Sequence, residues 1–540
     1  MTIRYLLAVI LFFALLLGHM PTVLGSSDPG QAAWVNVRDY GALGDGATDD
    51  TASIQAAIDD AHARGVPTVV IPAGHYMVDS AGKTAAAALR VRSNLTIEIQ
   101  SGATVELFPN DQRSHRMFYV LQCENVTFQG GGTLVGERYG HLGTSGEWGM
   151  GIDVRSSHNV TIKDLEIKEF WGDSIYVGGG ATMTTGYSTN ILIQNVNAHS
   201  SRRQGISVTS WVDGIIIEDC TIHNIYGTNP QSGIDIETND PEMPVRNVII
   251  RNNTFFDNVR CDILIGAEAK HVYIHGNTSL TGATRNAEYG IRAYHGKNVH
   301  IFNNKIEARE LGIQVRYNQG VKIYNNTITG QSRNGEYIGM GINLERQATN
   351  VSIRDNTLTR LDTGIFYDGN TDVTIERNHI QAIQRQGIRA WGHSYNITHQ
   401  ENIIENVIDG YGIYARGDGI KITGNTLEDI NGPSIFIHTG DGVVISKNQL
   451  VNLVWGQNPE FIEIDKFPAG VQILSNTFES PDRDKYAVTV SPALNEKVTI
   501  KHNIALYSRD PFNVSSLHIV RDNTYKGTES NRSLRLASGL

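Results

Sequence analysis

Five acidic residues lie within one stretch of the sequence: Asp153, Asp173, Asp235, Glu237 and Asp262. Neighbouring carboxyl groups can act as an acid and a base, because each negative charge raises the pKa of the other group. Inverting glycoside hydrolysis uses such a pair, with the carboxyls about 6.5–9.5 Å apart so that a water molecule fits. The same residues could instead form a calcium site, since calcium prefers hard oxygen ligands, or a solvated acidic patch.

Asp235, Glu237 and Asp262 come closest to that spacing. Asp235 and Glu237 stand two residues apart in a predicted strand, which separates them by about 6.7 Å. Asp262 falls one repeat later and two residues back along its strand, at a Cα distance of roughly 8 Å from Asp235. We therefore predict that Asp235 and Asp262 form a catalytic pair, with Glu237 assisting and with Asp173 and Asp153 in the same site.

Basic and aromatic residues are predicted to share the outward face of these strands. Arginine forks pair with the carboxylates of uronate sugars, and flat aromatic rings can stack on sugar rings. We expect Arg203 and Arg292 to hold substrate carboxylates. If the reaction is instead removal of a proton next to a carboxylate, Tyr176 or Tyr294 could transfer it. The other candidates for substrate binding are Arg155, Arg316 and Trp391.

The elements that must position these residues belong to a sequence repeat. A short pattern, seen at 151–155, 233–237 and 412–416, alternates apolar residues with outward polar ones. Its second position is isoleucine in twelve copies spaced 22 to 31 residues apart, a period typical of repeat architectures. These isoleucines are Ile152, Ile175, Ile206, Ile234, Ile263, Ile291, Ile313, Ile342, Ile365, Ile388, Ile413 and Ile435.

Most repeats contain a second short strand, and an asparagine often follows its last isoleucine by three residues. Stacked asparagines can hydrogen-bond along an internal ladder and tolerate the backbone angles of a turn. The pattern predicts an all-β fold, a right-handed parallel β-helix in which each coil buries its apolar face against its neighbours. The asparagines are Asn253, Asn277, Asn304, Asn326, Asn356, Asn378, Asn425, Asn448, Asn476 and Asn503.

Composition and the two ends of the chain limit the possible partners. The 540 residues carry a formal net charge of −11, which argues against nucleic acid as a partner. Residues 1–25 combine Arg4 with an apolar run and small residues before position 25, which predicts a cleaved signal peptide and a secreted or envelope protein. No later apolar run is long enough to span a membrane. We expect one β-helix domain over 26–528, with a cap at 35–80, and an irregular tail at 529–540.

The three cysteines, Cys123, Cys220 and Cys261, form an odd set. Cys220 occupies the position of the asparagine ladder in its repeat, and Cys261 directly precedes an outward-facing strand. Both are positions that a fold buries, so we expect buried free thiols rather than a disulfide or a metal site.

The cap carries a specific motif. Residues 41–65 contain turn glycines followed by a short amphipathic helix, which would cover the open end of a solenoid. This segment closely resembles the N-terminal cap of the pectate lyase superfamily, the group that holds rhamnogalacturonase-like and mannuronan C5-epimerase-like proteins. The resemblance implies a β-helix and an association with polysaccharides. The matching residues are 39–42, 44–46, 49–51, 54–55 and 71–74.

The site motifs of these families are matched only in part. The catalytic motifs of polygalacturonases are replaced, since residues 202–204 read Arg-Arg-Gln and 231–233 read Gln-Ser-Gly. Residues 150–155 resemble the Tyr-Gly-Phe-Asp-Pro-His strand of mannuronan C5-epimerases and keep its aspartate as Asp153. Met150 replaces the tyrosine of that strand and Arg155 replaces its histidine.

These observations favour a secreted enzyme that cleaves an acidic polysaccharide over the coils from Gly151 to Tyr294, with hydrolysis ahead of other reactions. A polysaccharide lyase or uronate C5-epimerase is the first alternative. A polysaccharide-binding envelope protein without enzymatic activity is the second. No cofactor is required, although calcium remains an alternative at the acidic residues.

Overall fold

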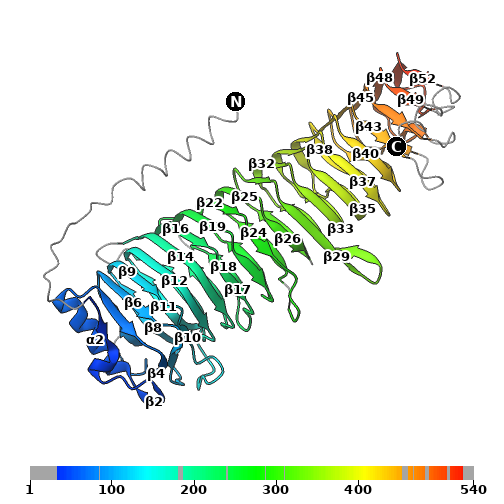
Figure 1. The fold of residues 1–540 in the computed structure, drawn as a ribbon. Helices are drawn as coiled ribbons and strands as arrows, with labels where there is room; N and C mark the ends of the chain where they lie inside the picture. Colours follow the sequence, from blue (N-terminus) through cyan, green and yellow to red (C-terminus); the bar gives the residue numbers. More distant parts are fainter. Residues whose placement is uncertain are drawn as a thin grey trace.

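A computed structural model describes residues 33–526, except 84–85, 181–185, 239–240, 286, 309, 453–459, 466, 481–485 and 507–510. Within this part, strands stack coil upon coil along one long axis (Figure 1), so the predicted parallel β-helix is confirmed. The predicted signal peptide at 1–25 and the predicted tail at 529–540 lie outside the described residues.

Each coil contributes strands to three rows, and each strand pairs in parallel with the strand of its own row one coil earlier and one coil later. The row that carries the candidate site is called the front sheet here. It consists of β5 (Ala87–Arg90), β8 (Ser114–Leu121), β11 (Trp148–Arg155), β13 (Asp173–Gly178), β15 (Gln204–Val208), β18 (Ser232–Ile236), β21 (Cys261–Ile265), β24 (Tyr289–Tyr294), β27 (Leu311–Arg316), β31 (Met340–Glu345), β33 (Thr357–Tyr367), β35 (His379–Ala390), β38 (Tyr411–Asp418), β41 (Ile435–Thr439), β44 (Glu460–Ile464), β47 (Tyr486–Val490) and β50 (Phe512–Asn513).

The second row follows the front sheet along the chain. It consists of β1 (Val35–Asn36), β3 (Thr68–Ile71), β6 (Leu95–Ile99), β9 (Glu124–Gln129), β12 (His158–Lys168), β14 (Ser188–His199), β16 (Val212–Glu218), β19 (Val245–Arg251), β22 (Lys270–His275), β25 (Lys297–Phe302), β28 (Lys322–Tyr324), β32 (Thr349–Arg354), β34 (Thr371–Glu376), β36 (Ser394–Gln400), β39 (Lys421–Thr423), β42 (Val444–Ser446), β45 (Gln472–Leu474), β48 (Thr499–Lys501) and β51 (Ile519–Arg521).

The third row closes each coil, and the long strands β12, β14, β33 and β35 take part in it as well. The remaining strands of this row are β2 (Asp45–Asp49), β4 (Gly74–Val78), β7 (Ala103–Leu107), β10 (Thr133–Val135), β17 (Thr221–His223), β20 (Thr254–Phe256), β23 (Thr278–Ser279), β26 (Lys305–Ala308), β29 (Thr327–Arg333), β37 (Ile403–Val407), β40 (Thr426–Ile430), β43 (Gln449–Val451), β46 (Thr477–Glu479), β49 (Ile504–Leu506) and β52 (Thr524–Lys526). A short strand, β30 (Glu336–Ile338), folds back antiparallel on β29.

The isoleucine ladder is confirmed by the register of the front sheet. Ile152 pairs with Ile175, Ile234 pairs with Ile263, and the same match continues coil by coil as far as Ile435. All twelve isoleucines are buried inside the solenoid. Because side chains alternate along a strand, the residue after each isoleucine then faces outward, and this sets the outward column that contains Asp235.

The asparagine ladder is also present and is longer than the sequence pattern suggested, since Asn402 belongs to it. Each of these asparagines donates its Nδ2 to the Oδ1 of the next one, for example from Asn326 to Asn356 at 3.0 Å. At the start of the ladder the backbone N–H of Cys220 donates to Asn253 Oδ1 at 2.9 Å. The three cysteines are free and buried, as predicted, and burial raises the pKa of the Cys220 thiol to about 12.

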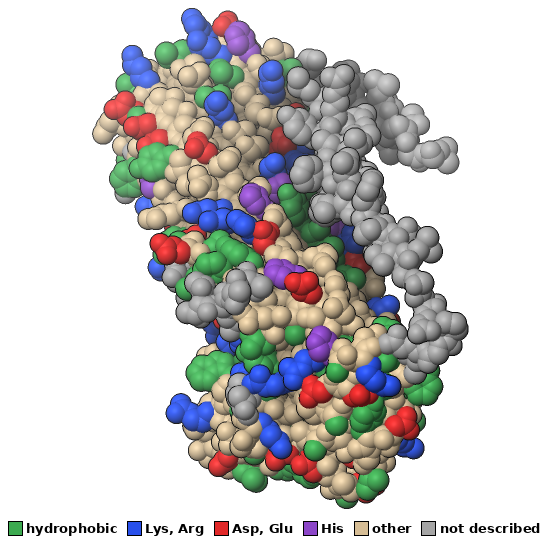
Figure 2. All heavy atoms as spheres, turned by 90° about the vertical axis from the view of Figure 1, so that its left-hand side faces the viewer, with side chains coloured by type: hydrophobic (Ala, Val, Ile, Leu, Met, Phe, Trp, Pro, Cys, Tyr) green, Lys and Arg blue, Asp and Glu red, His purple; other side chains and the backbone are tan. Residues whose placement is uncertain are grey.

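The N-terminal cap is built from the predicted helix α2 (Thr51–Arg64), which follows the short helix η1 (Val37–Tyr40). Ile54, Ala57 and Ile58 are fully buried on the inner face of α2, so the helix covers the first coil of the solenoid (Figure 1). Among the described residues, no helix is both long and apolar enough to cross a membrane. Seen from the cap end, acidic and basic side chains are interspersed on the surface (Figure 2).

Candidate functional site

Three of the predicted acidic residues gather on the outward face of β13, β15 and β18, around one arginine. Arg203 Nη1 lies 3.0 Å from Asp173 Oδ2, and Arg203 Nη2 lies 3.6 Å from Glu237 Oε1. Asp235 is fully buried beside them. We call Asp173, Arg203, Gln204, Ser207, Asp235 and Glu237 the acid cluster.

Strand pairing brings these side chains together. Asp173 pairs with Gln204 on the next strand, and Ser207 pairs with Asp235 on the strand after that. The Ser207 hydroxyl donates to Asp173 Oδ2 at 2.8 Å, and the Gln204 side-chain amide donates to Asp235 Oδ2. The middle strand therefore links the carboxyl groups of its two neighbours.

Burial raises the pKa of both aspartates of the acid cluster, Asp173 and Asp235, whereas the positive charge of Arg203 lowers it. Burial raises the pKa of Asp173 to about 6, although Arg203 and Ser207 both favour its charged form. The pKa of Asp235 is raised well above its usual range, first by burial and then by the negative charge of Glu237. Asp235 thus keeps its proton at a higher pH than an ordinary aspartate, which is what a proton donor needs.

Asp262, which we predicted to pair with Asp235, lies apart from the acid cluster. Its carboxylate accepts hydrogen bonds from Asn258 Nδ2 at 2.8 Å and from Ser279 Oγ at 2.6 Å. The groups that act on its pKa are these same two residues together with burial, whereas Glu237, Arg203 and Asp173 act on Asp235. The structure does not bring the predicted pair together.

The reason is the backbone direction at the glycine that precedes each ladder isoleucine. Asp262 stands at this position in its coil, one coil after Gly233. A Cβ built on Gly233 would point toward Phe255 Cδ1 at 3.0 Å and Asn258 Nδ2 at 3.2 Å, both buried inside the coil. Simple alternation from the isoleucine places this side chain outward, but the backbone here turns it inward.

Because burial raises the pKa of Asp262 to about 6, the folded protein holds this proton more tightly than the unfolded chain does. The stabilisation is complete below about pH 4 and is lost as the pH rises through 6. We expect Asp262→Asn, which cannot titrate, to gain on the order of 2–3 kcal/mol of stability relative to wild type between pH 4 and pH 7. Urea unfolding of both proteins across this range measures the gain, and a difference that stays constant with pH would contradict the assignment.

Asp153, Arg155 and Tyr176 form a second group next to the acid cluster. Asp153 is buried and accepts from Arg116 Nε at 2.8 Å and from Arg155 Nε at 2.6 Å. The Arg155 guanidinium also lies 3.8 Å from the centre of the Tyr176 ring. Arg155 is therefore already engaged with Asp153, and burial raises the pKa of Tyr176.

Arg292, Tyr294 and Arg316 continue the front sheet beyond the acid cluster. Arg292 lies 5.8 Å and Arg316 lies 5.7 Å from the centre of the Tyr294 ring. Trp391 is much farther along the axis, just after β35, and is 57% exposed. The structure thus separates Trp391 from the other predicted substrate-binding residues.

Several buried polar atoms on this sheet have no hydrogen-bond partner among the described residues. A buried polar atom without a partner is costly, so a run of them on one face points to a surface shaped for a polar ligand. These atoms are Arg203 Nε, Gln204 Oε1, Ser232 Oγ, Asp235 Oδ1, Arg292 Nε, Gln314 Oε1, Arg316 Nε and Asn343 Oδ1.

The turns between the third row and the front sheet add a side wall that sequence reasoning missed. The Tyr226 ring lies between two guanidinium groups, with Arg138 at 3.9 Å and Arg285 at 3.7 Å. A hydrogen bond with Tyr139 and these two positive charges lower the pKa of Tyr226. The three turns come from different coils, so no local sequence pattern connects them.

The side wall continues toward the acid cluster. Arg202 stacks on Trp171 at 3.7 Å, and Trp171 stacks on His141 with ring centres 3.9 Å apart. Behind them, burial alone would raise the pKa of Glu137, but hydrogen bonds with His115 and His141 lower it to about 2. These contacts hold Trp171, which lies two residues before Asp173, and Arg202, which directly precedes Arg203, in a fixed position.

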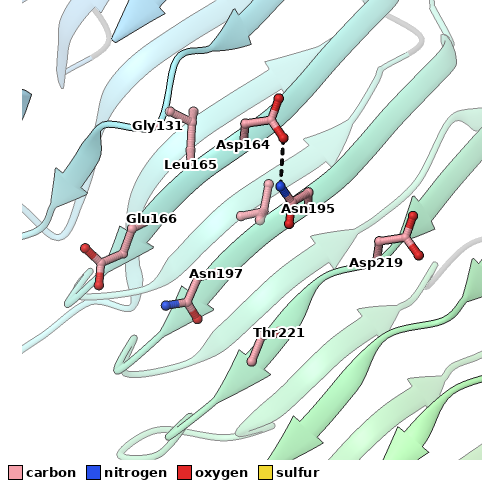
Figure 3. Close-up of a pocket in the computed structure, with 9 residues that line it drawn as sticks. Gly131, Asp164, Leu165, Glu166, Asn195, Asn197, Asp219 and Thr221 are labelled. Carbon is pink, nitrogen blue, oxygen red and sulfur yellow. Dashed lines mark hydrogen bonds between the residues drawn. The ribbon is translucent and has the colours of Figure 1, made fainter. Parts of the chain in front are cut away.

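A hollow of about 280 Å³ lies elsewhere on the solenoid, between the second and third rows (Figure 3). Asp164 and Asn195 line it and are joined by a hydrogen bond of 2.8 Å. None of the acid cluster lines this hollow. We place the candidate site on the front sheet because the side chains there can exchange protons and bind carboxylates, which a polar hollow alone does not supply.

The described residues contain no group of three or more histidine, cysteine, aspartate or glutamate side chains arranged to hold a metal ion. In the acid cluster, Arg203 lies between Asp173 and Glu237. Its guanidinium supplies the positive charge that a calcium ion would otherwise bring to these carboxylates.

Comparison with known proteins places the chain among β-helix proteins. The protein-family model described as "Right handed beta helix region" matches residues 118–279 and 279–404. The model described as "Rhamnogalacturonase A/epimerase, pectate lyase-like" matches residues 34–87, the segment of the cap. The solved structure of the pre-mature bacteriophage phi29 gene product 12 has a similar fold. Its superposition on this chain has a TM-score of 0.55 and 16% sequence identity, and it covers 91% of this chain and 73% of the phage protein.

Two kinds of relative are similar to this chain in sequence. The uncharacterized protein YclG of Bacillus subtilis (strain 168) is 29% identical over 526 residues, which is 91% of this chain and 87% of YclG. Mannuronan C5-epimerase AlgE4 of Azotobacter vinelandii is 30% identical over 211 residues, which is 38% of this chain and 36% of the epimerase. From its coils and its cap, the chain belongs to the right-handed beta helix family and carries a pectate lyase-like N-terminal segment.

Proposed function

We propose that this protein binds a uronate-containing polysaccharide across the front sheet between β11 and β24 and cleaves it by hydrolysis. The observation that carries the proposal is the state of Asp235. It is a buried carboxyl group with a raised pKa and one oxygen without a hydrogen-bond partner, two residues from Glu237, whose side chain is 31% exposed. Extended backbone places the Cα atoms of Asp235 and Glu237 about 6.7 Å apart, which allows their carboxyl groups to reach the separation of about 6.5–9.5 Å that inverting hydrolysis uses.

In this proposal Asp235 Oδ1 donates its proton to the glycosidic oxygen as the bond from that oxygen to the anomeric carbon breaks. Glu237 accepts a proton from a water molecule, and the oxygen of that water bonds to the anomeric carbon. Solvent then returns a proton to Asp235 and takes one from Glu237. Gln204 and Ser207 act through Asp235 and Asp173 and hold them in position.

Arginines supply the recognition of uronate carboxylates. Arg203 contacts the carboxylates of Asp173 and Glu237, so a sugar carboxylate bound here lies next to the reacting groups. Arg292 pairs with Leu264, the residue that pairs with Asp235 on the other side, and its Nε has no partner among the described residues. It is therefore placed to hold the carboxylate of a neighbouring sugar.

Uronate C5-epimerisation or elimination is the second candidate, and the similarity to mannuronan C5-epimerases favours it. Both reactions need a base for the C5 proton and a positive charge for the carboxylate. Asp153 is kept from the epimerase strand, but it is bound by two arginines, and burial raises the pKa of the nearby Tyr176. These features disfavour both groups as the base.

The test uses the purified protein with polygalacturonate, alginate and a neutral glucan, with and without calcium. Reducing ends and ultraviolet absorbance are followed together, and uronate composition is measured by NMR. We expect new reducing ends without absorbance. Absorbance that rises with the reducing ends would indicate elimination instead of hydrolysis. Altered uronate composition without cleavage would indicate epimerisation, and binding without any product would indicate a binding protein.

The sequence of residues 1–25 supports action outside the cell.

A further inference from the structure

A group of aromatic rings gathers on the front sheet far from the acid cluster. Tyr414 and Phe436 are neighbours across two strands, with ring centres 5.2 Å apart, and His438 is stacked on Phe436 at 6.2 Å. The group that we call the aromatic platform consists of Trp391, Tyr411, Tyr414, Phe436, His438 and Phe467.

Two residues of the aromatic platform, Tyr414 and Phe436, lie on the same outward column as Asp235. Tyr414 pairs with Arg389, and the column leads from Tyr414 back to Asp235 in seven coil steps, through Arg389, Asn343 and Arg292. At about 4.8 Å per strand, this places Tyr414 about 34 Å from Asp235 along the axis. One straight sheet face therefore carries both surfaces.

The rings of the aromatic platform are accessible. Trp391 is 57% exposed and Phe467 is 56% exposed, and the other rings are partly exposed. The solenoid core consists of the inward isoleucines, so outward positions at these coils need no aromatic residue for the fold. Exposed apolar side chains that gather in one patch usually mark a binding surface.

Two arginines stand among the rings. The Arg389 guanidinium lies 4.9 Å from the Trp391 ring, and Arg416 Nη1 donates to the Trp391 carbonyl at 2.9 Å. Neither arginine forms an ion pair within the described part of the chain, and Arg416 Nε is buried without a hydrogen-bond partner there. Two acidic residues also border the rings: Asp465 is paired with His438 at 2.9 Å, and Glu463 lies beside Phe436 on the next strand. The two arginines have no acidic partner of their own among the described residues, and flat rings combined with such arginines suit an acidic sugar chain better than an apolar partner.

We propose that the aromatic platform is a second, non-catalytic binding surface for the acidic polysaccharide, which stacks sugar rings on Trp391, Tyr414 and Phe436 and binds uronate carboxylates through Arg389 and Arg416. The class of ligand rests on the proposed function, whereas the location rests on the platform itself. A polysaccharide lying along the front sheet passes one coil of the solenoid for roughly each sugar unit, so one polymer molecule reaches both the acid cluster and the aromatic platform. Two linked contacts then raise the affinity for long chains without any new contact at the acid cluster.

The experiment measures binding rather than turnover. Wild type and the double variant Tyr414→Leu/Phe436→Leu are run through native gels that contain polygalacturonate or alginate, with a neutral glucan as reference. Leucine keeps apolar volume at both positions but removes the flat rings. We expect the double variant to bind the acidic polymer about tenfold more weakly, because each lost stacking contact contributes a factor of a few.

Two further variants make the result specific. Trp391→Ala removes a largely exposed ring, so it tests the platform without disturbing the core and should also weaken retention. Tyr395→Ala removes a tyrosine that is 51% exposed on β36, outside the front sheet, and should bind like wild type. Circular dichroism confirms the fold of each variant.

Equal retention of wild type and both platform variants would overturn the proposal. A wild-type dimer that becomes a monomer in the double variant, measured by light scattering, would also overturn it, because a second copy of the chain would then be the occupant. Weaker retention of the platform variants supports it even if no polymer is cleaved, so a failure of the proposed hydrolysis stays distinguishable.

Discussion

Asp235→Asn should lower the turnover of an acidic polysaccharide by about 100- to 10,000-fold. Asparagine has the same shape but no proton to donate to the glycosidic oxygen. Its carbonyl oxygen can still accept the hydrogen bond from Gln204, so the acid cluster should keep its arrangement. The measurement is kcat from the release of reducing ends, with substrate binding followed separately on polysaccharide gels. We expect kcat to fall while binding is retained.

Asp262→Asn is the matched variant, since it makes the same chemical change at another fully buried aspartate one coil away. Its side chain bonds to Asn258 and Ser279 inside the coil, so we expect it to keep turnover. If Asp262→Asn lost activity and Asp235→Asn kept it, the acid cluster would not be the site of the chemistry. Equal losses in both variants would restore the pair expected from spacing alone.

Asn356→Leu should destabilise the solenoid by roughly 3–5 kcal/mol, because leucine has a similar size but cannot hydrogen-bond. Asn356 Nδ2 donates to the carbonyl of Ile323 at 3.0 Å and to Asn378 Oδ1 at 2.9 Å. Its Oδ1 accepts from the backbone N–H and the side chain of Asn326, both at 3.0 Å. The substitution leaves several of these groups buried without partners. Urea unfolding followed by circular dichroism measures the loss.

Asn523→Leu provides the comparison at the end of the same ladder. Asn523 accepts from Asn503 and donates to the carbonyl of Ile500, but its side chain is only partly buried, and water can replace these bonds. We expect a clearly smaller loss of stability. Unfolding of Asn356→Leu at the same urea concentration as wild type would show that the ladder contributes little to stability.

The sequence by itself determined the architecture, because its apolar pattern repeats in register. A ladder isoleucine in every coil and an asparagine at a fixed distance after the next strand leave one way to stack the coils with both kinds of residue inside. The cap helix could be recognised for a similar reason, since Ile54, Ala57 and Ile58 fall on one helical face. The outward column that contains Asp235 followed directly from the isoleucine positions.

The tertiary structure alone decided which polar residues meet. Asp262 turns inward because the glycine position before the isoleucine directs its Cβ into the coil, which alternation along a strand does not predict. Gln204 and Ser207 join the acid cluster because strand pairing sets them between two aspartates, although neither residue carries a charge. Arg138 and Tyr226 are 88 residues apart, in turns separated by three coil steps, and only the folded chain brings them together. A side chain's partners depend on loop paths and backbone bends, which vary from coil to coil, whereas the core repeats.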